Sequence, residues 1–414
     1  MRGDARDLAL PRGFRDILPT EARELHAIER KLMAAFASYG YVPLEPPTVE
    51  FASTDGATLD ERRTLRFLDR DGRLLALRPD LTTAVARVVA QRYRDASDAA
   101  LRLAYFTPIF REELSMRGSE REYDQAGVEL IGAGGPRADA EVIALLAEAL
   151  SRCGLAAAEI DVGHAGYLSG FLAELPDDAR TAAADAARGG DHVGALAAAR
   201  AGGLSAGTVA ALERGLRHRV AGTLADARRD APRAAVAALD ELERLGPLLE
   251  AAGAGGAIRF DLGFVPTLSY YTGVVFQVTA PGLGFPIAAG GRYDGLLARF
   301  GADRPATGFG IAVPHLHQAI VAAEAGGPVE QEIPLVILVA AASDATTLRV
   351  AAALRSAGLD IAIGEVAESA GRATVRARVV DDAHVEYEGV ARALEAFVAV
   401  VSAPLGQDHV GGRR

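Results

Sequence analysis

The fold is decided by residues 105–132, which read Y-F-T-P-I-F-R-E-E-L-S-M-R-G-S-E-R-E-Y-D-Q-A-G-V-E-L-I-G. Two apolar runs, residues 104–110 and 127–131, alternate in polarity as strands do. Between them stands a charged turn that contains Arg117 and Gly118. The stretch therefore predicts a long β-hairpin.

Charged side chains on this hairpin are spaced so that they share faces. Residues two or four apart point to the same side of a strand, so Arg111 and Glu113 are expected together. By the same rule, Gln125 and Glu129 share a face of the other strand. A solvated strand pair with cross-strand ion pairs is the simpler interpretation. However, F-R-x-E followed by Q-x-x-x-E resembles motif 2 of the class II aminoacyl-tRNA synthetases, with its closest match in the histidyl branch.

This resemblance implies that the hairpin holds a small zwitterion. In the family, the arginine matched by Arg111 holds the α-phosphate of ATP and the carboxylate of the amino acid. The groups matched by Gln125 and Glu129 receive the substrate ammonium. A zwitterion needs acceptors at one end and a guanidinium fork at the other, and these residue types supply both.

A second candidate segment precedes the hairpin. Residues 74–77 predict a short buried strand that runs into R-P-D-L-T at residues 78–82. The proline keeps Arg78 extended, so Asp80 and Thr82 are expected to point the same way. Asp-x-Thr before an apolar run also matches a helix cap, and we expect both roles to coexist. The family places R-P-E-x-T here to contact the amino acid, which implies that Asp80 is a shortened carboxylate at a binding position.

The chain before this segment predicts a helix and a strand. Thr20 is the expected N-cap of an amphipathic helix that ends at Gly40. Its core positions are Leu25, Ile28, Leu32 and Phe36. The motif P-x-G-x-x-D at residues 11–16 resembles the opening of histidyl-tRNA synthetases. Residues 41–50 resemble motif 1, with Pro47 at the proline, and in the family this region forms a two-fold dimer interface.

Two later blocks predict an aromatic pocket. Residues 258–278 return to strand-like patterns, and A-G-G-R-Y-D-G-L at residues 289–296 follows a glycine-rich turn. Tyrosine hydroxyls beside a glycine-lined floor can hold a planar ring with polar tips, although half-buried strand tyrosines are also ordinary. Both blocks resemble the two histidine-specific signatures of histidyl-tRNA synthetases. By that match, Tyr271 and Tyr293 would line an imidazole pocket.

The pattern of elements predicts an α+β fold with two domains. Residues 1–325 are expected to form a class II aminoacyl-tRNA synthetase-like antiparallel sheet flanked by helices. A helix over residues 139–152 follows the hairpin, and alanine-rich periodicity from about 170 to 256 predicts an inserted helical module. Residues 333–414 predict a small α/β domain that resembles a reduced anticodon-binding domain.

Within that last domain, the expected elements are a strand at 335–340, a helix at 346–357, a strand at 361–363 and a helix from Val390. Residues 333–414 contain eight arginines, no lysine and ten acids, a net charge of −2. An RNA-binding role for this domain is therefore not expected.

Composition excludes several classes of function. Over 414 residues, 44 lysines and arginines stand against 55 acids, so the net charge of −11 disfavours nonspecific binding to nucleic acid. The only lysine, Lys31, lacks a glycine-rich lead, which excludes a P-loop. No Cys, His and carboxylate cluster has metal-ligand spacing, and no cofactor is expected.

Location is predicted from the same composition. No run of about 18 apolar residues predicts a membrane span. The first residues carry acids and lead into no apolar signal region. The single cysteine, Cys153, cannot form an internal disulfide. Together these features predict a cytoplasmic protein.

The resemblance breaks on the ATP side. The first histidine signature of the family reads R-G-L-D-Y-Y, whereas residues 266–271 read P-T-L-S-Y-Y. Pro266 has neither a charge nor a donor, so it cannot offset the charge that builds when a carboxylate attacks a phosphate. The motif 3 run at residues 308–315 places His315, mostly neutral at pH 7, where the family has an arginine. The hairpin turn departs as well, with Leu114, Ser115 and Ser119 in place of the R-P-Q-x-G-R pattern.

What survives is the amino-acid side of the site, without its catalytic cations. Such a chain resembles the regulatory subunits of short-form ATP phosphoribosyltransferase. The resemblance implies a non-catalytic homodimer within a hetero-oligomer with the catalytic subunit, in the first step of histidine biosynthesis, with feedback inhibition by free histidine. The histidine-binding residues that it implies are Asp80, Thr82, Arg111, Gln125, Glu129, Tyr271 and Tyr293.

Two alternatives stay open at this point. A divergent but active histidyl-tRNA synthetase would need another cation at the position of Pro266, and Arg259 and Arg292 are the nearby candidates. An amino-acid sensor with a different partner would keep the same pocket.

Overall fold

A computed structural model describes residues 9–52, 64–93, 99–112, 120–156, 158–217, 219–220, 224–266, 268, 270–323, 334–339, 343–364 and 374–402. The chain divides into two compact units, each treated by itself below. One comprises Met1–Asp16 with Glu24–Ala325, and the other Ile17–Arg23 with Gly326–Arg414. None of the helices in the described ranges combines the length and apolarity that a membrane span requires.

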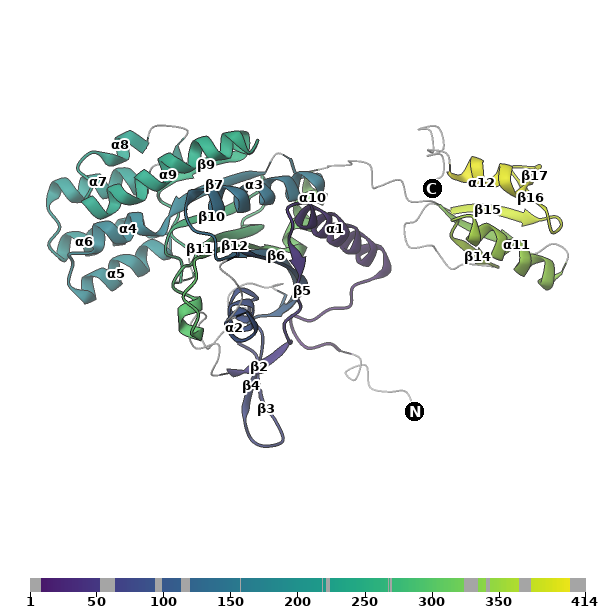
Figure 1. The fold of residues 1–414 in the computed structure, drawn as a ribbon, viewed down its shortest axis with the longest axis horizontal. Helices are drawn as coiled ribbons and strands as arrows, with labels where there is room; N and C mark the ends of the chain where they lie inside the picture. Colours follow the sequence, from purple (N-terminus) through teal and green to yellow (C-terminus); the bar gives the residue numbers. More distant parts are fainter. Residues whose placement is uncertain are drawn as a thin grey trace. The chain divides into compact units, whose positions relative to one another are not determined.

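The first unit is built on a nine-stranded sheet with the order β1-β5-β6-β12-β11-β10-β7-β9-β8 (Figure 1). Its strands are β1 Val42–Pro43, β5 Leu101–Phe110, β6 Glu122–Ile131, β7 Glu159–His164, β8 Arg219–Val220, β9 Ile258–Asp261, β10 Val274–Thr279, β11 Ala288–Arg292 and β12 Ala306–Ala312. The predicted hairpin is confirmed, because β5 and β6 pair antiparallel with Tyr105 opposite Gly127. Its turn, which includes Glu113, Arg117 and Gly118, lies outside the described residues.

Alternation along the hairpin separates two faces of the sheet. Ala126, Val128 and Leu130 of β6 belong to a large core cluster with helices of the same unit. Those helices include α1 (Pro19–Ser38), α3 (Pro136–Arg152) and α9 (Arg233–Ala251). By strand alternation, the side chains of Gln125 and Glu129 lie on the other face, and Glu129 bonds to Thr82 at the start of α2 (Thr82–Arg92). Figure 1 shows α2 beside the sheet formed by β5 and β6. Polar side chains of the hairpin are thereby collected between the sheet and α2.

The predicted first helix is confirmed in its core and wrong at its start. Leu25, Ile28, Leu32 and Phe36 are all buried. The helix begins at Pro19, so Thr20 lies inside its first turn instead of capping it. Proline suits the first helical turn because its missing N–H would have no partner there.

Helices fill the region between β7 and β9, with the two-residue strand β8 among them. Besides α9, they are α4 Ala165–Leu172, α5 Asp177–Arg188, α6 His192–Ala201, α7 Ala206–Leu216 and α8 Leu224–Arg228. Their alanines and leucines join the large core cluster, which explains the alanine-rich composition. The predicted helix after the hairpin is also confirmed, and it begins at Pro136 instead of residue 139.

A separate three-stranded sheet has the order β2-β4-β3, with β2 Val49–Phe51, β3 Arg66–Leu68 and β4 Leu74–Leu77. The strand at 74–77 is therefore confirmed, but its predicted burial is wrong. Leu74 is 44% exposed, and of the four residues only Ala76 is buried. A three-stranded sheet this small has few neighbours to cover it, so apolar residues remain accessible on it.

Within the strand-like stretch at residues 258–278, β9 ends at Asp261 and β10 begins only at Val274. Tyr270 and Tyr271 precede β10, and Tyr293 follows β11, so these tyrosines stand outside the ladders. They are not the half-buried strand aromatics of the simpler interpretation, and their side chains are available to a site.

The second unit contains a five-stranded sheet with the order β14-β13-β15-β16-β17. Its elements are β13 Leu335–Val339, α11 Asp344–Ser356, β14 Ile361–Ile363, β15 Thr374–Val379, β16 His384–Tyr387, β17 Val390–Ala393 and α12 Leu394–Ser402. The expected helix from Val390 is wrong at its start, because β17 pairs with β16 and the helix begins at Leu394. Strand pairing has overridden the helical preference of the local alanines.

Candidate amino-acid site

A cavity of about 200 Å³ lies on the α2 side of the large sheet. It is lined by six of the seven expected residues, namely Asp80, Thr82, Arg111, Gln125, Tyr271 and Tyr293. The seventh, Glu129, is buried beneath Thr82 and Tyr293 and hydrogen bonds to both. Segments far apart in sequence therefore meet in one place.

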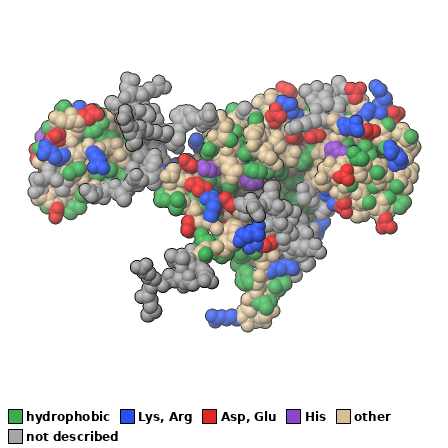
Figure 2. Space-filling model, turned by 180° about the vertical axis from the view of Figure 1, so that it is seen from behind, with side chains coloured by type: hydrophobic (Ala, Val, Ile, Leu, Met, Phe, Trp, Pro, Cys, Tyr) green, Lys and Arg blue, Asp and Glu red, His purple; other side chains and the backbone are tan. Residues whose placement is uncertain are grey.

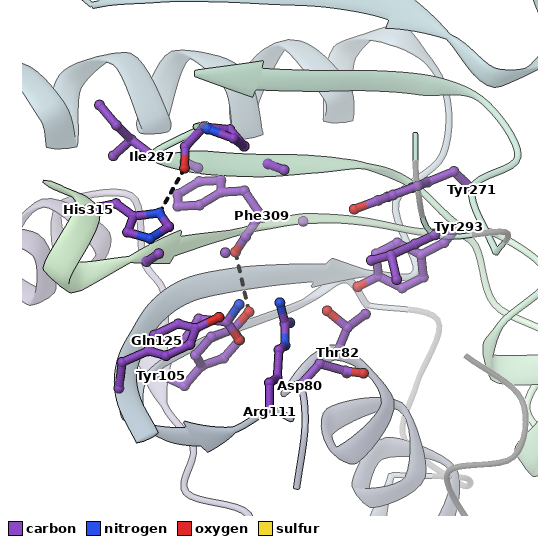
Figure 3. Close-up of a pocket in the computed structure, with 18 of the residues that line it drawn as sticks. Asp80, Thr82, Tyr105, Arg111, Gln125, Tyr271, Ile287, Tyr293, Phe309 and His315 are labelled. Atoms are coloured by element: carbon purple, nitrogen blue, oxygen red, sulfur yellow. Dashed lines mark hydrogen bonds between the residues drawn. The ribbon is translucent and has the colours of Figure 1, made fainter. Parts of the chain in front are cut away.

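Two ends of the cavity differ in character. Figure 3 shows Tyr271 and Tyr293 at one end, His315 at the other, and Arg111 between them with its guanidinium directed inward. The tyrosine end also contains Thr82, so it is rich in hydroxyl groups. Asp80 and Arg111 both line this cavity, so its wall offers groups of opposite charge to a small zwitterion.

Glycines of β12 make room for the polar side chains of β6. Gly308 pairs with Glu129 across the ladder, and a Cβ at Gly308 would overlap the Glu129 carboxylate. A Cβ at Gly310 would lie 2.6 Å from Nε2 of Gln125. Positions 308 and 310 of β12 are therefore glycine because the side chains of Glu129 and Gln125 occupy the space that a Cβ would need.

The Glu129 carboxylate is 1% exposed and is held by three hydroxyl groups. Thr82 Oγ1 donates to Oε1 at 2.8 Å, Tyr105 OH donates to Oε1 at 3.4 Å, and Tyr293 OH donates to Oε2. Burial raises the pKa of Glu129 to about 7, against the lowering effect of those hydrogen bonds. Within the described ranges no arginine, lysine or histidine pairs with this carboxylate. Its partners among those residues are therefore neutral hydroxyl groups.

Asp80 makes the hydrogen bonds expected of a helix cap, and its role in binding stays a prediction. Its Oδ1 accepts a hydrogen bond from the Thr83 backbone N–H at 2.9 Å, and Oδ2 accepts from Thr83 Oγ1 at 3.4 Å. These bonds cap the start of α2. The same side chain is buried at the cavity wall, so helix capping holds its carboxylate in place beside the site.

Arg111 is anchored by its own neighbours. Its Nε donates to the Pro79 carbonyl oxygen at 2.7 Å, which orients the guanidinium fork toward the cavity (Figure 3). Among the described residues that line the cavity, Arg111 is the one arginine, and no lysine accompanies it. The site therefore offers one strong anion-binding group.

His315 lies where the matching motif has an arginine. Its Nδ1 lies 3.0 Å from the Pro286 carbonyl oxygen, which requires a proton on that nitrogen. The Phe285 ring packs against it with centroids 4.2 Å apart. The cavity wall therefore presents an imidazole at the position where the motif has a guanidinium.

Neither candidate replacement for the missing cation reaches the cavity. Arg259 is 49% exposed on its side chain and pairs with Glu159. Arg292 is buried and pairs with Asp139 at 2.8 Å and with Asp294 at 3.0 Å. Both guanidinium groups are engaged elsewhere, and neither residue lines the cavity.

Sequence reasoning missed two tyrosines of the site. Tyr105 and Tyr270 line the cavity, and Tyr270 packs on Tyr271 and Tyr293 with ring centroids 4.7 and 5.7 Å away. Tyr105 had a signal, because it lies opposite Gly127 on the hairpin face that also contains Glu129. Burial raises the pKa values of these phenols, so they stay protonated and donate hydrogen bonds.

Comparison with known proteins finds relatives over most of the chain. The family model described as histidyl-tRNA synthetase matches residues 13–316. A protein of Moorella thermoacetica named ATP phosphoribosyltransferase regulatory subunit is 39% identical over 398 residues, covering 89% of this chain and 95% of its own length. One of Rubrobacter xylanophilus with the same name is 36% identical over 365 residues, covering 86% of this chain and 85% of its own length.

A solved structure shows the same architecture. The protein of Bacillus halodurans named ATP phosphoribosyltransferase regulatory subunit/histidyl-tRNA synthetase matches with a TM-score of 0.78 and 30% identity, over 90% of this chain and 98% of that one. Its fold is class II synthetase-like, as predicted from the hairpin. The chain belongs to the ATP phosphoribosyltransferase regulatory subunit family, which shares the histidyl-tRNA synthetase fold.

Proposed function

We propose that this chain is the non-catalytic regulatory subunit of a short-form ATP phosphoribosyltransferase, required for the first step of L-histidine biosynthesis. One observation carries the proposal: among the described residues, the cavity is lined by one guanidinium, Arg111, and by the Asp80 carboxylate, with the Glu129 carboxylate buried directly behind Thr82 and Tyr293. These groups suit the two ends of an amino acid. Adenylation needs further positive charge for the phosphates, and Arg259 and Arg292 pair with acids away from the cavity.

The proposed ligand is free histidine, bound by the seven residues predicted from the sequence. A volume of about 200 Å³ is below the roughly 300–1,000 Å³ of common ligand pockets, as suits a small amino acid. Arg111 takes its carboxylate, Asp80, Gln125 and Glu129 receive its ammonium, and the tyrosine end holds its ring. Feedback inhibition follows if histidine binds two states of the complex with different affinities.

A homodimer within the hetero-oligomer is part of the proposal. By strand register, Val49, Phe51, Phe67, Leu75 and Leu77 share one face of the small sheet. The first three of these are at least 40% exposed. Figure 2 shows hydrophobic side chains on the lobe that β2, β3 and β4 build. Such an apolar face adjoining the motif 1 segment supports a contact between copies of this chain.

The proposal is tested by mixing the purified chain with a short-form ATP phosphoribosyltransferase. We expect association at a defined mass, a rise in phosphoribosyl transfer, and inhibition by added histidine. A chain without the transferase should show no histidine-dependent exchange of pyrophosphate into ATP. Absence of both association and rate change, or clear pyrophosphate exchange by the chain alone, would contradict the proposal.

Ligand affinity is expected to depend on pH through Glu129. A ligand ammonium binds the ionised carboxylate, and the pKa of Glu129 is about 7. Affinity should therefore be full above about pH 8 and fall up to tenfold per pH unit below pH 7. The measurement is calorimetric titration between pH 5.5 and 8.5 with thiazolylalanine, an analogue whose ring does not titrate in this range. A flat profile would contradict the assigned role of Glu129.

A further inference from the structure

Arg78 is a buried cation that the proposed binding scheme does not use. Arg78 is 3% exposed, and its guanidinium donates hydrogen bonds to other groups of the protein. Nε donates to the Pro108 carbonyl oxygen at 2.8 Å, and Nη1 donates to the Pro46 carbonyl oxygen at 2.5 Å. Nη2 donates to Thr107 Oγ1. Arg78 therefore joins the motif 1 segment to strand β5.

This arrangement is unusual because the charge lacks an acidic partner. In the part of the chain that the structure describes, no carboxylate forms an ion pair with Arg78. Burial lowers the pKa of its guanidinium, which indicates the cost of keeping the charge there. Glu50, Glu45 and Asp124 raise the pKa of Arg78 through charge alone, without a hydrogen bond, so the side-chain hydrogen bonds of this buried charge go to neutral acceptors, which leaves its desolvation only partly offset. An apolar side chain would avoid this desolvation cost, but it could not donate the three hydrogen bonds of the guanidinium. We therefore take the planar geometry of these bonds as the reason for an arginine here.

The backbone of Arg78 reinforces the same junction. Its N–H donates to the Thr48 carbonyl oxygen at 3.0 Å, and its carbonyl oxygen accepts from the Phe110 N–H at 3.0 Å. Main chain and side chain together fix Arg78 to the segment before β2 and to the end of β5. The next residues in the chain have little freedom to shift.

Those next residues hold both ends of the proposed ligand site. The Pro79 carbonyl oxygen accepts the 2.7 Å bond from Arg111 Nε that directs the guanidinium into the cavity. Asp80 follows at once, with its carboxylate at the cavity wall. A shift of Arg78 would therefore displace the anion-binding fork and an ammonium acceptor together.

We propose that Arg78 is a positioning residue that sets the separation between the anion-binding and ammonium-binding ends of the cavity. It does not line the cavity and acts through Pro79 and Asp80. The inference rests on the proposed histidine site and goes beyond it by assigning the residue that fixes the distance between Arg111 and Asp80. Loss of register should harm ligands that use both ends more than ligands that use one.

The test compares histidine with histidinol, which lacks the carboxylate, on the intact chain. In the wild type, histidine should bind more tightly because Arg111 holds its carboxylate. The substitution Arg78→Lys keeps the charge and removes the fork, and the ratio of the two affinities should fall at least about tenfold. The matched control is Arg102→Lys on β5, the strand that also contains Thr107, where Arg102 bonds to Glu141 through two hydrogen bonds of 2.8 Å away from the cavity. That variant should lose stability with an unchanged ratio.

A milder variant keeps the test decisive if Arg78→Lys does not fold. Thr107→Val removes a single acceptor of the guanidinium and should lower the ratio in the same direction by less. An unchanged ratio in the folded variants, or an equal fall in Arg102→Lys, overturns this inference and leaves the histidine site intact. Failure of the wild type to bind histidine overturns the proposed histidine site, and this inference with it, whereas the regulatory function is tested separately by association with the transferase.

Discussion

Replacement of Glu129 by glutamine is expected to weaken histidine binding about a hundredfold or more while the fold persists. A buried charge-assisted contact contributes about 3 kcal/mol, which corresponds to that loss in affinity. Glutamine has nearly the same shape, so the packing around Thr82 and Tyr293 survives. Because burial raises the pKa of Glu129, the variant should be at least as stable as the wild type at pH 8. Calorimetric titration and thermal unfolding measure the two effects.

The matched control for this change is Glu141→Gln. Glu141 is bonded to Arg102 at 2.8 Å through each oxygen and lies outside the cavity. Its replacement should lower the free energy of unfolding without changing histidine affinity, the opposite pattern to Glu129→Gln. Binding by Glu129→Gln within about threefold of the wild type would show that this carboxylate is not the ammonium acceptor.

Strand alternation made the hairpin and its polar face predictable from sequence. A period of two is a local property, so the shared face of Gln125 and Glu129 needed no knowledge of the rest of the chain. The same rule would have found Tyr105 on that face. Tyr270 carries no such signal, because it lies in a loop before β10, and only the tertiary fold brings it to the cavity.

Burial and strand order depend on neighbours that sequence patterns do not name. Residues 74–77 are as apolar as a core strand, yet they lie in a small sheet with an open face. Val390 begins a run with helical composition, yet pairing with Tyr387 makes it a strand. The local pattern predicted a strand correctly at residues 74–77 and a helix wrongly at Val390. In both places the outcome depended on the neighbouring elements, which a local pattern does not identify.

The separation of amino-acid binding from ATP use also needed the fold. Pro266 and His315 indicated the loss of two cations, but a nearby arginine can replace a missing one. In the structure, Arg292 forms an ion pair with Asp139, a residue of helix α3 that is far away in sequence. Moving Arg292 to the cavity would leave the Asp139 carboxylate buried without its bidentate partner, at a large cost in free energy. The ion pair with Asp139 therefore keeps Arg292 out of the cavity.

Close packing between β6 and β12 makes a glycine position as important as a polar one. Gly308 faces Glu129, and the nearest atoms to an added Cβ include the Glu129 carboxylate and the Val128 carbonyl oxygen. Backbone in the middle of a nine-stranded sheet has no room to move away. The carboxylate must leave its hydroxyl partners if a methyl group enters.

Gly308→Ala is therefore expected to abolish histidine binding and to lower the free energy of unfolding by about 1–3 kcal/mol, the usual cost of overpacking. Two controls separate site damage from a general effect of glycine removal. Gly284→Ala adds a methyl group with nothing within 4 Å and should change neither property. Gly310→Ala meets the end of the Gln125 side chain, which can rotate away, so binding should weaken with little loss of stability. Chemical denaturation and calorimetric titration on the three variants measure both quantities, and wild-type affinity in Gly308→Ala would show that Glu129 need not stay where its three hydroxyl partners hold it.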